Sequence, residues 1–311
     1  MERNYEEVAA RFWNQPYKAD EEAARELYFM DDIIQKAHLD REIDRHLGGV
    51  QTVFDGGAGT GRFTIPLARR GLKVTHFDIS RPMLAKAKEL AAEAGVLGNM
   101  TFVEGALTDL DRYEDGAFDL VLSFDAPISY TYPRHNEVLR HLVRIARKAV
   151  IVSVSSRLGY APYFFNPAQK MQYLADERSH DPAVQWYVRH SEQAIANWEP
   201  DFKQLNALLE SGLTEDPEQV YAEMSRGKTP WPVNYCFHPG ELANVLTEAG
   251  LKNIRLAGPG AFARSIPQPI LRQMLFSSKE RERFLDACYR FDSSPYVCGL
   301  GKDNLVASGV K

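Results

Sequence analysis

Five residues in the first third of the chain have the types and spacing of a ligand-binding turn. Residues 50–55 are a short, largely apolar run that ends at Asp55, and glycines follow at positions 57, 59 and 61. Glycines let the backbone turn sharply and approach a ligand closely. Asp78 stands 17 residues after Gly61, at the end of the next apolar run. A carboxylate at that position can accept hydrogen bonds from both hydroxyls of a ribose.

The glycine spacing separates two classes of nucleotide ligand. A dinucleotide site needs the pattern G-x-G-x-x-G, so that a pyrophosphate can bind at the start of the following helix. Here the pattern is G-x-G-x-G, and Asp55 precedes it. A carboxylate repels a pyrophosphate, whereas it suits a ligand with an ammonium group. A ribose joined to an amino-acid tail describes S-adenosylmethionine.

Four segments, in order, resemble the motifs of class I S-adenosylmethionine-dependent methyltransferases of the small-molecule (type 11/25-like) group. They are DGGAGTGRFTIPLA (55–68), HFDIS (76–80), FVEGALTDL (102–110) and FDLVLSFDA (118–126). The resemblance covers residues 45–157 and, less sharply, 239–311. It implies an α/β fold, a three-layer α/β/α Rossmann-like sheet of seven mostly parallel strands with an antiparallel last strand, plus a helical insertion. It also implies methyl transfer from S-adenosylmethionine, with S-adenosylhomocysteine as product.

The resemblance further implies which residues contact the cofactor. Asp55 would help to hold the methionine amino group, and Asp78 would bind the ribose. The other implied contacts are the backbone of Gly57, Ala58 and Gly59 beneath the cofactor, Ile79 and Met83 against the adenine, Leu107 at the adenine edge through its backbone, and Phe124 and Asp125 near the sulfonium.

One position departs from the family pattern. Many relatives have Gly-Asp-Ala in the loop after the third strand, where this chain has Gly-Ala-Leu at 105–107. Ala106 cannot accept a hydrogen bond from the adenine amino group with its side chain. Water, a backbone carbonyl, or the side chain of Thr108 or Asp109 would replace that acceptor, or packing alone would select adenine.

Three residues are candidates for chemistry on the methyl acceptor. Asp125 and Tyr130 lie in the loop after the fourth expected strand, at the sheet edge where ligands bind in open α/β folds. His238 is the third candidate, because aromatic residues and a cysteine adjoin it. Asp125 also has a simpler interpretation as a turn former. Tyr130, Tyr132 and His135 would line the acceptor pocket or would otherwise be packing or surface residues. His238 would otherwise be a structural or solvated histidine.

The elements that must position these residues alternate along the chain. Apolar residues recur at helical spacing in residues 5–48, with a break at 14–16. Further helices are expected after the glycine turn up to residue 68, and over 82–94, 137–147, 239–249 and 269–290. Strands are expected at 50–55, 72–78, 100–104, 118–124, 149–154, 251–257 and 304–310. This alternation predicts βαβ units and a parallel sheet covered on both faces.

Residues 158–238 interrupt the alternation. They hold 13 aromatic residues, and their 11 acidic against 6 basic side chains account for the whole net charge of −5. We interpret them as an aromatic-rich helical lid over the acceptor. The chain then divides into N-terminal helices with the cofactor-binding half of the α/β domain (1–157), the insertion (158–238), and the C-terminal completion of the α/β domain (239–311).

Composition excludes several other classes. The 311 residues include 42 acidic and 37 basic side chains and 44% apolar residues, which is typical of a soluble globular protein. Three cysteines form no CxxC pair and no zinc pattern, so no metal is expected. Without a signal peptide or a membrane-spanning run, we expect a cytoplasmic protein. The sequence contains no stripe of basic side chains, which a surface that binds nucleic acid would need. We therefore predict a small-molecule methyl acceptor, with a protein or RNA methyltransferase, or a catalytically silent S-adenosylmethionine-binding protein, as the alternatives.

Overall fold

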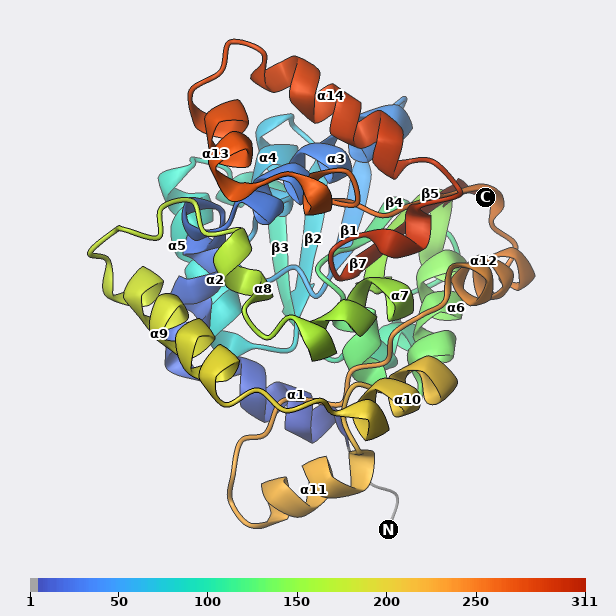
Figure 1. Ribbon diagram of the computed structural model, residues 1–311. Helices are drawn as coiled ribbons and strands as arrows, with labels where there is room; N and C mark the ends of the chain where they lie inside the picture. The colour runs from blue at the N-terminus through green and yellow to red at the C-terminus, as the bar shows by residue number, and fades with distance from the viewer. Residues whose placement is uncertain (1–4) are drawn as a thin grey trace.

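The computed structural model describes residues 5–311 and arranges seven strands in one sheet of order β3-β2-β1-β4-β5-β7-β6 (Figure 1). The strands are β1 (Thr52–Gly56), β2 (Lys73–Asp78), β3 (Met100–Glu104), β4 (Phe118–Ser123), β5 (Ala146–Ser155), β6 (Lys252–Ala257) and β7 (Asn304–Val310). Strands β1 to β5 pair in parallel, and β7 is antiparallel to both of its neighbours. The expected fold is confirmed, including the antiparallel last strand.

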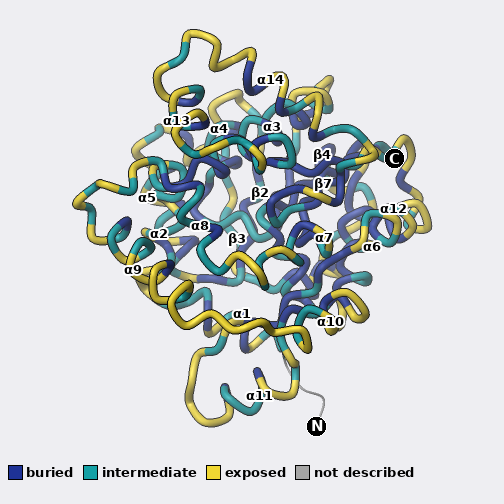
Figure 2. The backbone as a smooth tube through the Cα atoms, viewed as in Figure 1, coloured by how far each residue is buried: buried dark blue, intermediate teal, exposed yellow. Residues whose placement is uncertain are grey.

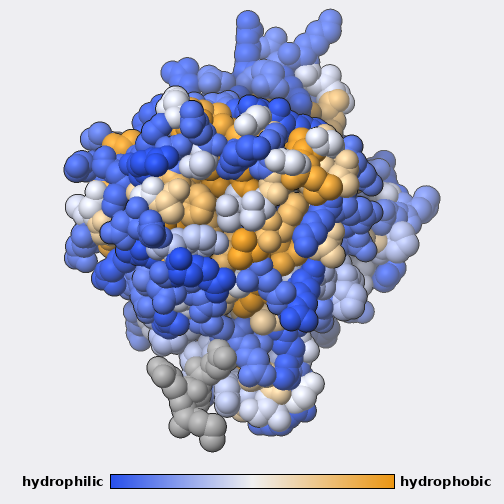
Figure 3. Space-filling model, turned by 180° about the vertical axis from the view of Figure 1, so that it is seen from behind, coloured by the Kyte–Doolittle hydropathy of each residue, from blue (hydrophilic) through white to orange (hydrophobic). Residues whose placement is uncertain are grey.

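Helices surround this sheet. The N-terminal helices are α1 (Tyr5–Trp13), α2 (Pro16–Tyr28) and α3 (Met30–His46), and those between or after strands are α4 (Thr64–Arg69), α5 (Arg81–Glu93), α6 (His135–Ile145), α12 (Pro239–Glu248), α13 (Gln268–Phe276) and α14 (Arg281–Asp292). Short 3₁₀ helices are η1 (Leu97–Asn99), η2 (Leu107–Arg112), η3 (Pro127–Thr131), η4 (Ala161–Phe165), η5 (Ala263–Ser265) and η6 (Cys298–Leu300). Polar residues cover most of the surface seen from behind (Figure 3).

The two faces of the sheet carry separate cores, because successive side chains of a strand point to opposite faces. Val53 of β1 belongs to a core that includes Leu39 of α3 and Leu67 of α4. Its neighbour Phe54 belongs to the core that includes Leu139 of α6. Both Val53 and Phe54 are fully buried, and Figure 2 shows the central strands as the most buried part of the chain. Because the strands are buried on both faces, their sequences are nearly continuous apolar runs.

The N-terminal helical region breaks twice. The first break, between α1 and α2, lies where the sequence predicts it. The second is at Phe29, which has extended backbone (φ −123°, ψ 124°) and forms an isolated bridge with Leu174. The N–H of Met30 then donates to the carbonyl of Tyr173 at 2.8 Å. This break depends on a partner in a distant segment, so no local pattern predicts it.

Residues 158–238 leave the sheet after β5 and return beside it. Ser156 forms a parallel bridge with Phe237, whose N–H donates to the carbonyl of Ser155 at 2.8 Å. Between these ends the chain forms mainly helices, which are α7 (Arg157–Tyr160), α8 (Gln169–Gln172), α9 (Pro182–Ala196), α10 (Phe202–Ser211) and α11 (Pro217–Ser225). Figure 2 shows exposed outer surfaces on α9 and α11. No helix within residues 5–311 is long and apolar enough to cross a membrane.

The insertion packs on the N-terminal helices. The hydroxyl of Tyr187 on α9 donates to Glu21 Oε1 of α2 at 2.5 Å. At the other end of the insertion, Val220 of α11 packs with Val8 of α1. These contacts hold the insertion beside α1 and α2, and together they wall the site described next.

Candidate active site

A cavity of about 460 Å³ lies among the loops that follow β1 to β4, helices α1 and α2, and the insertion. This volume is in the usual range of small-molecule pockets. Every residue expected to contact the cofactor lines it, namely Asp55, Gly57, Ala58, Gly59, Asp78, Ile79, Met83, Ala106, Leu107, Phe124 and Asp125. The fold therefore brings the sequence-predicted cofactor residues together at one edge of the sheet.

The glycine loop is fixed by Asp78, the last residue of β2. Its Oδ2 accepts a hydrogen bond from the Gly59 N–H at 2.8 Å, and its Oδ1 accepts one from the Ser80 N–H at 2.8 Å. Burial raises the pKa of Asp78 to about 6, although these backbone hydrogen bonds oppose the shift. Gly57 has φ +73°, and a Cβ there would lie 2.5 Å from Cβ of Pro127. The loop thus requires glycine at this position.

Asp55, at the end of β1, is buried and only 2% exposed. Among the described residues its Oδ1 has no hydrogen-bond partner. Burial, followed by the charges of Asp125 and Asp78, raises the pKa of Asp55 to about 7. A buried carboxylate without a partner is costly, so this position favours a ligand that brings a positive charge or hydrogen-bond donors.

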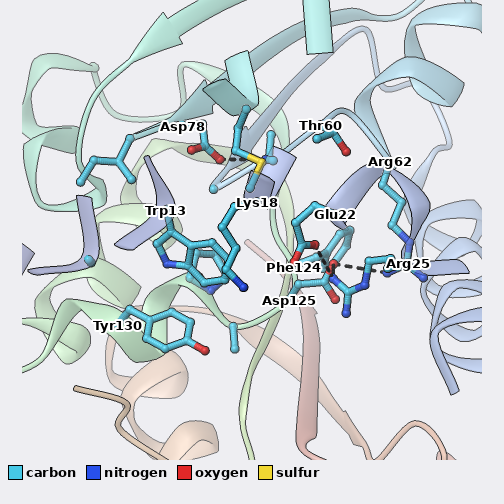
Figure 4. A pocket seen from close by; sticks show the side chains of 18 of the residues that line it. Trp13, Lys18, Glu22, Arg25, Thr60, Arg62, Asp78, Phe124, Asp125 and Tyr130 are labelled. Atoms are coloured by element: carbon cyan, nitrogen blue, oxygen red, sulfur yellow. Dashed lines mark hydrogen bonds and ion pairs between the residues drawn. The ribbon is translucent and has the colours of Figure 1, made fainter. Parts of the chain in front are cut away.

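Asp125 follows β4 in an unusual backbone conformation. Asp125 and Ala126 both have φ of +63°, which is uncommon outside glycine, and strained positions of this kind tend to cluster at functional sites. The Asp125 N–H donates to Ser153 Oγ at 2.8 Å. Its Oδ2 lies 3.1 Å from Arg25 Nη1 and 3.3 Å from Arg62 Nη1. Figure 4 shows both arginines on one side of the cavity.

The arginines belong to a wider ion-pair network. Arg25 of α2 also pairs with Glu22 at 3.0 Å and with Asp32 at 2.7 Å. Arg62, the residue after the last glycine of the loop, pairs with Glu26 at 2.7 Å. Two guanidinium groups therefore contact the same oxygen of the Asp125 carboxylate and hold it at the cavity wall. The geometry therefore favours a positioning role for Asp125 over that of a base.

The other two catalytic candidates are placed differently. Tyr130 of η3 lines the cavity, with its ring centroid 5.8 Å from that of Trp13 and 6.2 Å from that of Trp231. Burial raises the pKa of Tyr130 well above its usual value, so its hydroxyl stays protonated. His238 is exposed at the start of α12 and is not among the residues that line the cavity. The expectation that His238 reaches the site is therefore corrected.

The other two residues expected in the acceptor pocket lie outside the cavity wall. Tyr132 and His135 stack on Tyr235, with ring centroids 6.3 Å and 3.9 Å from it. Neither is among the residues that line the cavity. Within residues 5–311, no group of three or more His, Cys, Asp or Glu side chains is placed to hold a metal ion.

The sequence interpretation missed much of the wall opposite the cofactor residues. This wall comes from the N-terminal helices, the insertion and the start of β7, and it includes Trp13, Lys18, Glu21, Glu22, Arg25, Phe29, Tyr160, Tyr163, Lys170, Trp186, Tyr187, Trp231 and Asp303. The enrichment of aromatic residues in 158–238 was the one available signal. The aromatic enrichment indicates a functional surface, but it does not identify which residues line the cavity.

Comparison with known proteins finds similarity over part of the chain. The sequence model of a methyltransferase domain matches residues 53–149. The chain is 38% identical over 117 residues to a chloroplastic magnesium protoporphyrin IX methyltransferase of Arabidopsis thaliana, covering 38% of this chain and 36% of that protein. It is 29% identical over 155 residues to the tRNA 5-carboxymethoxyuridine methyltransferase of Escherichia coli K12, covering 50% of this chain and 56% of that protein.

One solved structure aligns along nearly the whole chain. It is the magnesium protoporphyrin IX methyltransferase from Synechocystis PCC 6803 with bound SAH, with a TM-score of 0.48, 14% identity and coverage of 98% of this chain and 99% of that chain. The chain spans less than two thirds of the length of the Arabidopsis and Escherichia coli relatives. The matched residues 53–149 include Asp55, the glycine loop, Asp78 and Asp125.

Proposed function

We propose that this protein transfers a methyl group from S-adenosylmethionine to a small molecule held in the cavity, since the sequence model of a methyltransferase domain matches residues 53–149. The observation that carries the proposal is the pair of carboxylates at the ends of β1 and β2. Asp55 and Asp78 line one cavity beside a glycine loop that Asp78 itself holds in place.

The residues present fit this cofactor. The hydroxyls of a ribose donate to the Asp78 carboxylate, which the backbone already orients. The ammonium group of the methionine tail supplies the positive charge and the donors that buried Asp55 Oδ1 lacks. Met83 and Leu107, both buried in the cavity wall, provide an apolar surface for the adenine.

The chain's own residues would act by binding and orientation. When bound, the cofactor supplies a methyl group activated by a positively charged sulfur. Trp13, Tyr130 and Trp231 form an aromatic cluster at the cavity that can hold an apolar acceptor in line with that group. Such positioning supplies about 7–11 kcal/mol of a bimolecular barrier. The insertion would exclude water, and Tyr187 holds it to α2 through Glu21.

The ion pairs of Asp125 and the retained proton of Tyr130 limit which acceptors can react. Asp125 is occupied by Arg25 and Arg62, and Tyr130 keeps its proton and so acts as a hydrogen-bond donor. Neither side chain is suited to remove a proton from the acceptor. We therefore favour an acceptor atom that is already unprotonated at neutral pH.

A small molecule fits this site better than a nucleic acid. The Arabidopsis relative is named for a porphyrin and the Escherichia coli relative for a tRNA, so these names alone do not decide the class of acceptor. The insertion beside the cavity carries the chain's net charge of −5, and a phosphate backbone needs basic side chains.

The test uses purified protein, methyl-labelled S-adenosylmethionine and a cell extract. We expect label in the small-molecule fraction, where mass spectrometry identifies the product. Label that nuclease or protease converts to small fragments would instead indicate RNA or protein methylation. Cofactor binding by calorimetry with no labelled product would indicate a protein that binds the cofactor without transferring the methyl group.

A further inference from the structure

Among the described residues, one of the four basic side chains that line the cavity forms no ion pair with an acidic side chain. Lys18 pairs with Glu21 at 2.7 Å, and Arg25 and Arg62 belong to the network around Asp125. For Lys170, the fourth, no carboxylate within residues 5–311 lies at ion-pair distance. Lys170 lies on α8, at the insertion side of the cavity.

The surroundings of Lys170 leave its charge poorly compensated. Its Nζ lies 4.7 Å from the ring centroid of Phe29, which also lines the cavity. Burial lowers the pKa of Lys170, and the charge of Lys302 lowers it further. The carboxylates of Asp31, Asp32 and Asp303, none of them at ion-pair distance, oppose this shift. Lys302 is itself paired with Asp31. A ring face compensates a half-buried ammonium only in part, so Lys170 favours an anionic partner from outside the chain.

Two tyrosines extend this group of donors. Tyr160 and Tyr163 line the same cavity, and their ring centroids are 4.9 Å apart. Burial raises the pKa of both hydroxyls, so both stay protonated. Within the described chain neither hydroxyl has a hydrogen-bond partner, in contrast to Tyr187, which donates to Glu21. Residues 160–170 therefore offer an ammonium and two O–H donors to one space.

We propose that the methyl acceptor carries an oxyanion, a carboxylate or a phosphate, and that Lys170 binds it with the help of Tyr160 and Tyr163. The inference rests on the proposed methyl transfer and specifies its substrate class. An oxyanion only accepts hydrogen bonds, so it matches a set of groups that can all donate. A cationic acceptor would instead face an unpaired ammonium. Phe29 and Trp186, in the same wall, would contact an apolar body attached to the anion.

The first test divides an extract that supports methyl transfer on an anion exchanger. We expect the acceptor in the retained fraction. Loss of acceptor after phosphatase treatment identifies a phosphate, and survival identifies a carboxylate. An acceptor found in the flow-through contradicts the inference but leaves methyl transfer standing. If the unfractionated extract supports no methyl transfer, the proposed function fails. The proposal that Lys170 binds the methyl acceptor then fails as well.

Variants connect the charge preference to Lys170. Lys170→Met keeps the length of the side chain without its charge, and we expect KM for the retained acceptor to rise about tenfold or more, as for one lost charge-assisted hydrogen bond. Lys170→Arg should preserve most of the affinity. Lys203→Met, on an exposed face of α10 in the same insertion, is the matched control. Cofactor affinity measured by calorimetry should be equal in all four proteins, which excludes general unfolding.

A binding measurement tests the site without turnover. Protein saturated with S-adenosylhomocysteine is titrated with 2-naphthoate and with its neutral isostere 2-naphthamide, and the fluorescence of the cavity tryptophans Trp13, Trp186 and Trp231 is followed. We expect tighter binding of the acid in the wild type and no preference in Lys170→Met. Equal affinities in the wild type, no measurable binding of the acid, or a preference retained in Lys170→Met would each contradict the inference.

Discussion

The carboxylate of Asp78, at the end of β2, accepts a hydrogen bond from the backbone N–H of Gly59 at 2.8 Å. This bond ties the acidic end of the second strand to the loop that follows the first. The same carboxylate also accepts from the Ser80 N–H, at the start of α5. The side chain of Asp78 therefore fixes the shape of the glycine loop. The same two hydrogen bonds orient the carboxylate, so its remaining lone pairs point in fixed directions.

Replacing Asp78 should weaken cofactor binding more than it weakens the fold. In Asp78→Ala we expect the dissociation constant for S-adenosylmethionine to rise about 100-fold, because two hydrogen bonds to a charged group are lost. Titration calorimetry measures the constant, and far-ultraviolet circular dichroism checks the fold. Asp111→Ala removes an exposed carboxylate from the nearby η2 helix and serves as the control. An unchanged dissociation constant in Asp78→Ala would contradict the proposal that Asp78 binds the ribose of the cofactor.

Two glycines of the loop should respond differently to alanine. Both have positive φ, +73° at Gly57 and +57° at Gly59, so either substitution costs about 1–2 kcal/mol of backbone strain. A Cβ at Gly57 would also lie 2.5 Å from Pro127, whereas a Cβ at Gly59 would meet no atom of residues 5–311 within 4 Å. We expect Gly57→Ala to lose a further 1–3 kcal/mol or so of unfolding free energy through overpacking. Urea denaturation measures both variants, and equal losses would contradict the contact with Pro127.

The Asp125→Asn variant tests whether Asp125 positions neighbouring groups or accepts a proton. The substitution keeps the shape of the side chain but leaves Arg25 and Arg62 with less counter-charge. The side chains of Asp125 and Arg25 are 25% and 20% exposed, so we expect a loss of about 1–2 kcal/mol in unfolding free energy, between the values for surface and buried ion pairs.

The pH profile of kcat decides the catalytic question for Asp125. If Asp125 only organises the wall, its asparagine variant keeps the acidic limb of the profile and changes mainly the cofactor affinity. Loss of that limb in Asp125→Asn would identify Asp125 as the base. Glu26→Gln, which removes the more exposed partner of Arg62, is the control for a weakened ion pair.

The predictable part of the site is the part encoded by contiguous residues. Asp55 and Asp78 were found because each ends a buried strand, and parallel strands bring their carboxyl ends to one edge. Arg25 and Lys170 were missed because their roles depend on partners from distant segments, as does the helix break at Phe29. His238 was misplaced since its neighbour Phe237 is fully buried against the sheet, while the chain turns into α12 and leaves His238 in solvent.

The titration of the cavity carboxylates predicts opposite effects of pH on the free and the cofactor-bound protein. The pKa values of Asp55 and Asp78, about 7 and about 6, lie above the usual value for aspartate. Between about pH 4 and pH 7 the native state therefore binds protons that the unfolded state has released, so these groups make the free protein less stable as pH rises. The cofactor needs both carboxylates ionised, and its affinity should rise over the same range.

We expect S-adenosylhomocysteine to bind roughly 30-fold more tightly at about pH 8 than at about pH 5.5, from the ionisation of Asp55 alone. Calorimetry at both pH values measures this, and Asp55→Asn should bind weakly with a much smaller pH dependence. Asp292 provides the control, since burial raises its pKa to about 7 as well, but its carboxylate accepts from the N–H groups of Gly260 and Phe262 outside the cavity. Asp292→Asn should alter the pH dependence of stability and leave that of binding intact. An affinity that is flat or falls with rising pH would show that the cofactor does not need the ionised carboxylates.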